Sequence, residues 1–329
     1  MTIGIRIANG FSAFVIAVVF GLPAVAQDAA GFPNKPIRVI VPYAAGGLQD
    51  SMARIIGPRL NAQLGQPIMI ENRGGAGGIS GCEAVAKAAP DGYTLLVAGV
   101  GQLAINPALY AKLPYDPVKD FAPVSVMGTS TIYVVAAEST GIATFADMVA
   151  QAKARPGQLN YGSSGIGSLH HLTMETLKAA LGLDIVHVPF KGTGQMLPAL
   201  LGGQLTLGLS SLPSLAPYIR SGRVKLLAIN VGKRSTQEPD VPTIAELGIP
   251  GFDFPSPIGL LAPAGTPPAV VAKLAAEVAK AVHDPDTVRR FNAIGVDSVG
   301  SSSEVYAAMI RGDLEKYAKA VRISRARVD

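Results

Sequence analysis

The sequence predicts an α/β protein of two lobes, each a mainly parallel sheet flanked by helices. Short apolar runs alternate with helical runs along the chain, and this alternation favours parallel sheets covered on both faces. Two further β-rich apolar segments, residues 123–136 and 254–263, have the character of crossings between lobes and would form a hinge. Two crossings divide the first lobe, so that residues 27–130 and 252–329 form lobe 1 and residues 131–251 form lobe 2.

The strand candidates share a short length and a high content of Val, Ile and Leu. They lie at residues 37–41, 68–71, 93–98, 159–163, 185–188, 206–209 and 224–230. The helix candidates lie at residues 50–64, 79–88, 145–154, 169–181, 197–201, 213–221, 267–282 and 303–322. Small polar or acidic residues stand at several helix starts, where their side chains can cap the first backbone amides. These residues are Asp50, Thr144, Ser168 and Ser303.

Residues 1–26 have the pattern of a secretory signal peptide. Arg6 precedes an apolar run at residues 11–22, and Ala24-Val25-Ala26 is a small-x-small cleavage site. The apolar run is short for a membrane span. The sequence therefore predicts cleavage after Ala26 and a periplasmic protein.

Charge and cysteine content exclude several classes of protein. The net charge of +5 comes from scattered Lys and Arg residues without a basic run, which argues against nucleic acid as a partner. Cys82 is the only cysteine, so the chain has no internal disulfide. Its place at a helix start could activate the thiol, but we interpret it as a buried core residue.

The first candidate ligand loop follows the strand at residues 37–41. Small residues at positions 44–47 lead into a helix with Asp50 in its first turn. The free N–H groups and the dipole of a helix start both favour a negatively charged group. This loop is therefore suited to a carboxylate or a phosphate.

Three further loops follow strands and open helices. They lie at residues 99–102, 162–168 and 190–194; all three are rich in Gly, and the last two also carry Ser or Thr hydroxyls. Such loops can bind a carboxylate through backbone amides and hydroxyls without burying a salt bridge. In open α/β sheets the ligand lies beyond the carboxyl ends of the strands, so two facing lobes would line one cleft.

Seven sequence segments resemble the periplasmic substrate-binding proteins of tripartite tricarboxylate transporters, called the Bug family. The ordered set covers nearly the whole chain after the signal peptide. The segments are IRVIVPYAAGGLQD at 37–50, ENRGGAGG at 71–78, PDGYTLL at 90–96, LPYDPVKDFAPV at 113–124, HVPFKGTG at 187–194, KRS and PDVPTIAELGIPG within 233–251, and GLLAPAGTP at 259–267. The resemblance implies the periplasmic binding protein fold and a receptor without catalytic activity, cofactor or metal. Such a receptor would deliver a di- or tricarboxylate, or an aromatic acid, to membrane permease subunits, and would act as a monomer.

The resemblance also implies which residues contact the ligand. Ala45, Gly46, Gly47 and Asp50 would belong to the first lobe, and Ser163, Ser164, Gly165, Gly167 and Ser168 to the second. Further candidate contacts lie on the same loops or at strand ends. They are Tyr43, Gly99, Gln102, His170, Lys191, Gly192 and Ser211. Lys191 is a candidate anion partner. Asp50 would repel a carboxylate, so we expect it to cap its helix and orient loop amides. His170 could either contact the ligand or pack against the protein, and we expect His187 in the core.

Several positions differ from the usual pattern of the family. Ile166 makes the loop at 162–168 less polar, no Trp precedes the GLLAP segment, and Ser210-Ser211 stand where Asp or Asn is common. A less polar lining would suit a carboxylate with an apolar or aromatic body.

The sequence argues against dinucleotide binding, serine hydrolysis and metal binding, and leaves one alternative role open. Residues 99–104 satisfy G-x-G-x-x-A, but Pro107 follows closely in a turn-like Asn-Pro pair, and no acidic strand end follows at the spacing of dinucleotide sites. An exported serine hydrolase would need G-x-S-x-G, and Ile166 stands where the second Gly is required. The adjacent His170 and His171 cannot form an i, i+4 metal pair. A receptor that presents its ligand to a membrane sensor is the remaining alternative to transport.

Overall fold

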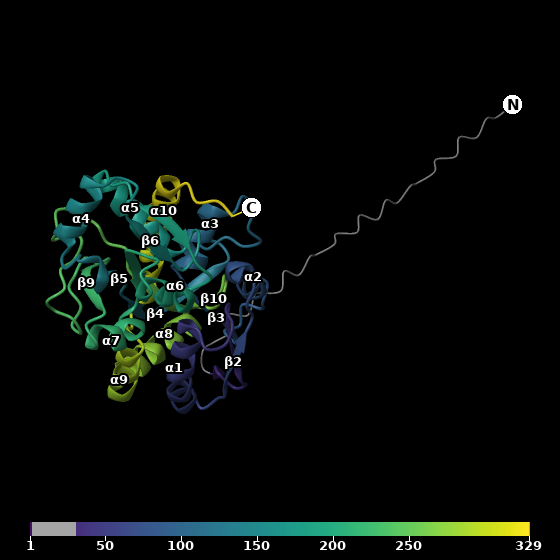
Figure 1. The fold of residues 1–329 in the computed structure, drawn as a ribbon. Coiled ribbons are helices and arrows are strands. Elements are labelled where there is room, and N and C mark those ends of the chain that lie inside the picture. The colour runs from purple at the N-terminus through teal and green to yellow at the C-terminus, as the bar shows by residue number, and fades with distance from the viewer. Residues whose placement is uncertain (2–30, 329) are drawn as a thin grey trace.

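The computed structural model describes Met1 and residues 31–328, so all of the predicted signal peptide except Met1 lies outside the described residues. The described chain forms two β-sheets with helices packed on both faces of each (Figure 1). The two-lobed α/β fold is thus confirmed, while the lobe boundaries stay a prediction. Among the described residues, no helix is both long and apolar enough to cross a membrane.

The first sheet has six strands. Its order is β11 (Val296–Ser298), β4 (Phe121–Ser130), β10 (Ser256–Pro263), β3 (Thr94–Gly99), β1 (Ile37–Val41) and β2 (Ile68–Asn72). Strand β1 runs parallel to β2 and β3, whereas β10 runs antiparallel to β3 and β4, and β11 antiparallel to β4.

The second sheet has five strands. Its order is β7 (Val186–Pro189), β6 (Asn160–Ser163), β8 (Leu207–Ser210), β5 (Tyr133–Ala137) and β9 (Val224–Ile229). Strand β6 is parallel to β7 and β8, and β5 is antiparallel to β8 and β9. Both sheets are therefore mixed, with a parallel part beside an antiparallel part, rather than mainly parallel. The antiparallel part forms around β4, β5 and β10, which lie in the predicted crossing segments.

Ten α-helices are present in the described chain. They are α1 (Leu48–Leu64), α2 (Ile79–Ala86), α3 (Asn106–Leu109), α4 (Phe145–Ala154), α5 (Leu169–Leu181), α6 (Thr193–Leu201), α7 (Leu212–Arg220), α8 (Pro268–His283), α9 (Pro285–Ala293) and α10 (Ser303–Ser324). Helices α1 and α8 pack on one face of the first sheet, and α2 and the start of α10 pack on the other. Helices α6 and α7 cover one face of the second sheet.

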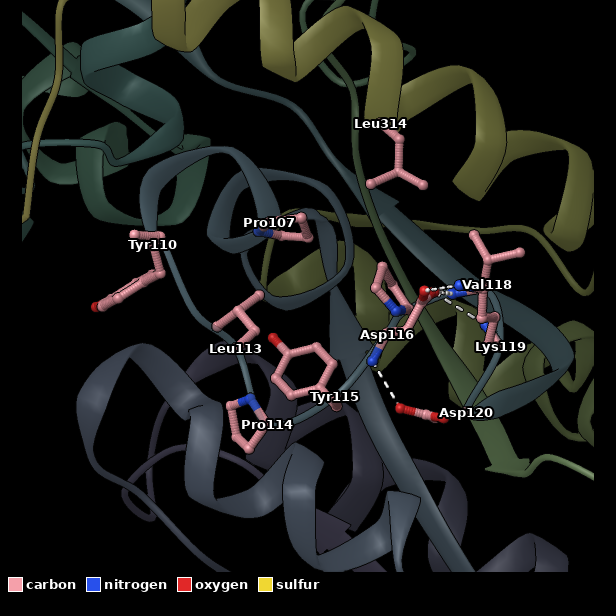
Figure 2. A pocket seen from close by; sticks show the side chains of 12 residues that line it. Pro107, Tyr110, Leu113, Pro114, Tyr115, Asp116, Val118, Lys119, Asp120 and Leu314 are labelled. Carbon is pink, nitrogen blue, oxygen red and sulfur yellow. Dashed lines mark hydrogen bonds and ion pairs between the residues drawn. The ribbon is translucent and has the colours of Figure 1, made fainter.

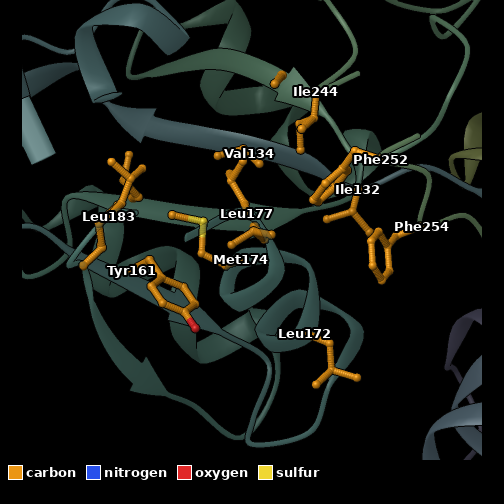
Figure 3. Packing of buried hydrophobic residues seen from close by; sticks show 14 of the residues in the cluster. Ile132, Val134, Tyr161, Leu172, Met174, Leu177, Leu183, Ile244, Phe252 and Phe254 are labelled. Carbon is orange, nitrogen blue, oxygen red and sulfur yellow. The ribbon is translucent and has the colours of Figure 1, made fainter. Parts of the chain in front are cut away.

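The other face of the second sheet packs against α4 and α5 (Figure 3). Val134 of β5 and Tyr161 of β6 belong to the same buried cluster as Leu172 and Leu177 of α5. Side chains alternate between the two faces of a strand, which explains why Tyr133 belongs to the opposite cluster.

Helix α10 contributes to the cores on both sheets. Tyr306 and Ile310 belong to a buried cluster of the first sheet, and Tyr317 and Val321 belong to the cluster of the second sheet. Figure 1 shows the helix, in yellow, beside α5. A single helix therefore joins the two halves of the molecule by packing.

The crossing segments are tied to each other by Asn230, which is fully buried. Its Oδ1 accepts a hydrogen bond from the Ile132 N–H at 2.9 Å, and its Nδ2 donates to the Phe254 carbonyl at 2.5 Å. Buried amides are costly unless paired, and these contacts satisfy Asn230 in one geometry. Asn230 thus joins the segment that leads from the first sheet to the second, at Ile132, to the segment that leads back, at Phe254.

The segment after β3 and the segment after α8 also differ from the prediction. The pair Asn106-Pro107 begins the short helix α3 instead of a turn, and the π-helical turn η3 (Gly101–Ile105) precedes it. Proline fits the first turn of a helix because the N–H that it lacks has no helical partner there. Helix α9 was not predicted, although Asp284 caps it by accepting from the Asp286 and Thr287 amides.

Candidate ligand-binding site

A cavity of about 970 Å³ lies where the carboxyl ends of β1 and β3 face the ends of β6 and β7. Its lining comes from both sheets and from the segments that follow these strands. The lining residues are Tyr43, Ala44, Ala45, Gly46, Gly47, Leu48, Gln49, Gly77, Gly99, Val100, Gly101, Ile105, Asn106, Leu109, Tyr110, Ser164, Ile166, Gly167, Ser168, Leu169, Lys191, Gly192, Ser256, Ile258 and Val328. The position agrees with the general rule for ligands of open α/β sheets.

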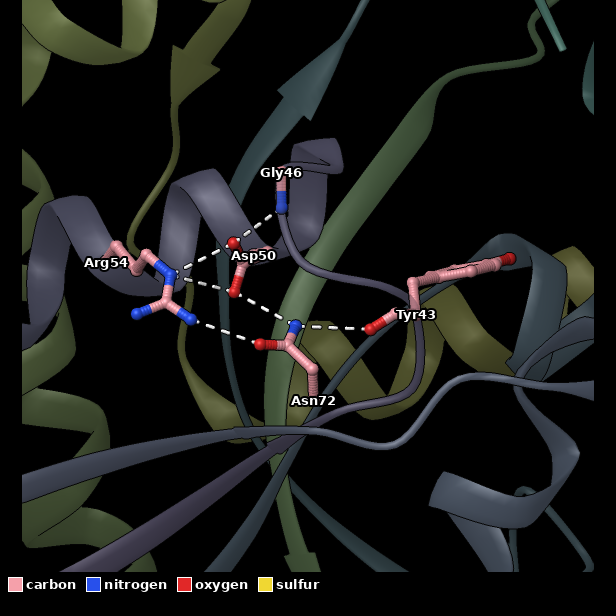
Figure 4. Close-up of polar contacts among 5 residues, drawn as sticks. All are labelled: Tyr43, Gly46, Asp50, Arg54 and Asn72. Carbon is pink, nitrogen blue, oxygen red and sulfur yellow. Dashed lines mark hydrogen bonds and ion pairs between the residues drawn. The ribbon is translucent and has the colours of Figure 1, made fainter.

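The first loop is held in place from behind by Asp50 (Figure 4). Asp50 is 2% exposed, and its carboxylate accepts from the Gly46 N–H at 2.9 Å and from Arg54 Nε at 3.0 Å. Asn72 Nδ2 donates to Asp50 Oδ1 at 3.0 Å and to the Tyr43 carbonyl at 3.1 Å. Burial alone would raise the pKa of Asp50, but the hydrogen bonds from Arg54, Gly46 and Asn72 lower it overall.

Asp50 therefore does not line the cavity, whereas Tyr43 and residues 45–47 do. Gly46 has a φ of 86°, which a residue with a side chain rarely adopts. Gly47 stands at the N-cap of α1 without a capping side chain. The first amides of α1 are thus presented beside the cavity by small residues.

The second loop is held by Gln102, which is fully buried and lies behind the lining. Its Oε1 accepts from the Gly99 N–H and from Gln49 Nε2, both at 3.2 Å, and its Nε2 donates to the Tyr43 hydroxyl at 2.6 Å. Burial raises the pKa of Tyr43. Gln102 thereby fixes two lining residues, Gly99 and Tyr43, without lining the cavity itself.

The third loop, residues 163–168, is held by three histidines. Ser163 Oγ lies 2.7 Å from His187 Nε2, Ser164 Oγ lies 2.7 Å from His170 Nδ1, and the Gly167 N–H donates to His171 Nδ1 at 3.1 Å. Ser164, Gly167 and Ser168 line the cavity, whereas Ser163, Gly165 and His170 lie behind it. Ser168 also caps α5 by accepting from the His171 N–H.

Lys191 supplies the only charged side chain among the described lining residues. Gly192 follows it and stands at the N-cap of α6 without a capping side chain. Ser211, at the N-cap of α7, is not part of the lining. Among the described lining residues, the cavity therefore carries positive charge and amide donors without a carboxylate.

Much of the remaining wall is apolar. Leu48, Val100, Leu109, Ile166 and Ile258 all lie in the lining. A wall of this kind can cover the carbon skeleton of a ligand while the loops bind its polar ends.

Sequence reasoning missed several parts of the lining. They include Leu48, Gln49, Gly77, Leu169, Ser256, Ile258, Val328, and Ile105, Asn106, Leu109 and Tyr110. The loop at 99–102 was identified, but the Asn-Pro pair was interpreted as a turn, so the helix beyond it was not placed at the cavity. Apolar residues at 100, 105 and 109 were the available signal. Val328 follows α10 near the end of the chain and gave no sequence signal.

A second cavity, of about 790 Å³, lies on the segment between α3 and β4 (Figure 2). Its lining includes Asp116, Asp120 and Lys119. Asp116 Oδ1 accepts from the Val118 and Lys119 amides, and Asp120 Oδ2 accepts from the Asp116 N–H at 2.6 Å. Two carboxylates in its wall make this cavity less suitable for an anion than the first.

Comparison with known families decides the class of protein. Residues 52–325 match the family described as "Tripartite tricarboxylate transporter family receptor". The chain belongs to this family. Its members are solute receptors and not enzymes, which excludes the serine hydrolase considered above. The resemblance to the Bug family is confirmed by Protein BugT of Bordetella pertussis, which is 35% identical over 298 residues, covering 90% of this chain and 91% of BugT.

Solved structures of this receptor family show the same fold. A structure described as a periplasmic transporter is 40% identical, with a TM-score of 0.77, and covers 91% of this chain and 100% of its own. Rpa4515 of R. palustris, solved with adipate, is 32% identical with a TM-score of 0.78 and covers 90% and 100%. MatC from Rhodopseudomonas palustris, with bound malate, is 35% identical with a TM-score of 0.74 and covers 88% and 100%.

Proposed function

We propose that this receptor captures a small dicarboxylate, or an acid with an apolar body, in the cavity of about 970 Å³. The observation that carries the proposal is the charge pattern of the wall, in which Lys191 is joined by amide-rich loops and apolar side chains. Two related receptors were solved with adipate and with malate, which supports a ligand of this class.

The proposed contacts fall on both halves of the molecule. Tyr43, Gly46, Gly47 and Gly99 would bind from the first half, and Ser164, Gly167, Ser168, Lys191 and Gly192 from the second. Lobe 1 would comprise residues 27–130 and 252–329, and lobe 2 residues 131–251. Ligand binding would favour the closed arrangement because only that arrangement completes both sets of contacts.

The remaining parts of the proposal concern location and partners. The chain would be exported by its signal peptide, cleaved after Ala26, and would act as a monomer in the periplasm. It would then deliver its ligand to the membrane subunits of a tripartite tricarboxylate transporter.

The proposal is tested by a thermal-shift screen of residues 27–329, followed by calorimetry. The screen contains adipate, malate, tricarboxylates, aromatic acids, sugars and NAD. A ligand that binds only the folded protein raises Tm by mass action. We expect shifts with carboxylates alone, and shifts with sugars or NAD alone would contradict the proposal.

Substitution of the charged lining residue provides a matched comparison. Lys191→Met should weaken the binding of the best carboxylate about ten- to a hundredfold, the range for a hydrogen bond to a charged group. Lys153→Met, on the exposed surface of α4, should leave Kd unchanged. Equal affinities in the two variants would remove Lys191 from the site.

A further inference from the structure

Three of the four histidines in this chain hold the 163–168 loop, one residue each. His187 pairs with Ser163, His170 with Ser164, and His171 with Gly167. Since Ser164 and Gly167 line the cavity, this histidine cluster lies directly behind a ligand-binding surface. The proposed function assigns no role to it.

The contact between His171 and Gly167 requires a neutral imidazole. A backbone amide can only donate, so His171 Nδ1 at 3.1 Å must accept. An imidazolium carries N–H groups on both nitrogens and has no acceptor to offer. Protonation of His171 would place one N–H against another, and the loop would have to move.

The other two contacts tolerate either state of their histidine. Ser163 and Ser164 meet His187 and His170 through hydroxyl groups, which can donate or accept. Either hydroxyl could therefore reverse its role when the ring gains a proton. His171 is the member of the cluster whose protonation the loop cannot accommodate.

The surroundings of His171 also disfavour a positive charge. His171 is buried and stacks on His187 at 4.0 Å between ring centroids, and His187 stacks on Tyr161 at 4.8 Å. The charged groups nearby are Glu175 and Lys178 of α5. Glu175 Oε1 already accepts from Lys178 Nζ at 2.6 Å and from the Tyr161 hydroxyl at 2.7 Å.

The pKa values of the three histidines are all lowered, in agreement with their buried and stacked positions. Burial lowers the pKa of His171, with Lys178 acting in the same direction and Glu175 against it. Burial lowers the pKa of His187 to about 4, with a further contribution from His171. Burial likewise lowers the pKa of His170 to about 4. The neutral cluster is thus the stable form at neutral pH.

We propose that His171 is a positioning residue of the ligand site, whose neutral ring holds Gly167 in place and whose protonation releases the loop and weakens carboxylate capture. The inference rests on the proposed function for its ligand, but the contact itself can be observed without one. Acidification would then act on this half of the site, separately from any titration of the ligand.

The test compares three proteins between pH 7.5 and 4. They are the wild type, His171→Asn and His283→Asn. Asn keeps an acceptor near the place of Nδ1 but cannot be protonated in this range. His283 ends α8, where its Nδ1 lies 2.8 Å from the Ala279 carbonyl, and does not line the cavity, so its variant is the control. The readouts are the ¹⁵N–¹H signal of Gly167 without ligand and the Kd for adipate and for malate.

We expect the Gly167 signal to titrate in the wild type and in His283→Asn, and to lose that step in His171→Asn. As the pH falls below the pKa of His171, the Kd of the wild type should rise faster than the Kd of His171→Asn. The ratio of the two Kd values should grow by up to about tenfold per pH unit. The ligand titrates identically in all three experiments, so the ratio of Kd values isolates the protein. The inference depends on how the ratio of Kd values changes with pH, and a difference in Kd between the variants at neutral pH does not bear on it.

Parallel pH profiles of the wild type and His171→Asn, in both readouts, would overturn the inference. A Gly167 signal that titrates with His171 in a protein that binds no carboxylate at pH 7.5 would overturn the proposed function and retain His171 as the residue that positions the loop. The two failures are therefore distinguishable.

Discussion

At the scale of single residues, several small residues that line the cavity are held by polar side chains behind them. Asp50 and Gln102 were predicted at the ligand site; in the structure they lie behind the lining, where they hold Gly46, Gly99 and Tyr43. The prediction that Asp50 is the cap of its helix is wrong, because α1 begins at Leu48 with Gly47 as the N-cap. The prediction that Asp50 orients loop amides agrees with its contact to the Gly46 N–H. Each anchor is buried, so its removal leaves unpaired groups beneath the loop.

Asp50→Asn should therefore weaken ligand binding, although the two side chains have nearly the same size and shape. One of the two carboxylate oxygens becomes an NH₂ group, which cannot accept from Gly46, Arg54 or Asn72. Loss of a hydrogen bond to a charged group costs about 1.5–3 kcal/mol within the protein. Because the ligand would then have to order the first loop itself, we expect a Kd about tenfold higher. Calorimetry with the best carboxylate measures this change.

The control for this substitution is Asp286→Asn. Asp286 forms an exposed ion pair with Arg289 on α9, and exposed pairs contribute little to stability. We expect Kd within experimental error of the wild type. If Asp50→Asn also bound normally, the carboxylate would not be what holds the first loop.

The sequence could identify the loops but not the layer behind them. Gly and Ser runs after strands locate the lining because their chemistry is local. The pairing of His171 with Gly167, or of Gln102 with Tyr43, depends on how elements distant in the sequence pack. Those contacts required the structure.

At the scale of elements, the alternation of strands and helices was sufficient to place most of the fold. The direction of strand pairing was not readable, because an apolar strand buried on both faces has the same composition in either orientation. Helix α9 was missed because it is short and follows α8 without a loop, so that Asp284-Pro285 resembles the end of one helix as much as the start of the next.

Helix α10 offers a comparison of two valines in one helix. Val321 is 7% exposed in the second-sheet cluster, and Val305 is 52% exposed in the first turn. Val321→Ala removes buried methyl groups and leaves a cavity, so the free energy of unfolding should fall by about 2 kcal/mol. Val305→Ala should change it by less than about 0.5 kcal/mol.

Urea denaturation of both variants measures these changes. Similar losses would mean that α10 is not anchored on the second sheet. A loss confined to Val321→Ala would support the view that the two halves are joined through this helix as well as through the crossing strands.

At the scale of the whole molecule, the histidine cluster makes stability depend on pH. His170 and His187 have folded pKa values of about 4, below the ordinary value of 6.5. The unfolded chain therefore binds more protons between these values, and stability falls as the pH is lowered from 6.5 to 4. Asp297 and Asp313 act in the opposite direction, because burial raises the pKa of each carboxyl.

The contribution of one histidine can be separated by comparing slopes. His187→Gln should lose less stability than the wild type over this range, by on the order of 1 kcal/mol per pH unit. Urea denaturation at pH 7, 6, 5 and 4.5 measures both slopes, with His283→Asn as the control. Identical slopes would show that His187 titrates alike in the folded and unfolded chain.

The way α10 packs also governs when the protein can fold. The cluster on the second sheet takes Val100 and Ile105 from the early part of the chain and Tyr317, Val321 and Ala326 from its end. Contacts between such distant segments close late and slow folding. During synthesis, the cluster would stay incomplete until residues 317–326 have emerged, so we expect this half of the molecule to complete its core late. The export proposed for this chain would benefit from that delay, because an unfolded chain can be threaded through a membrane pore.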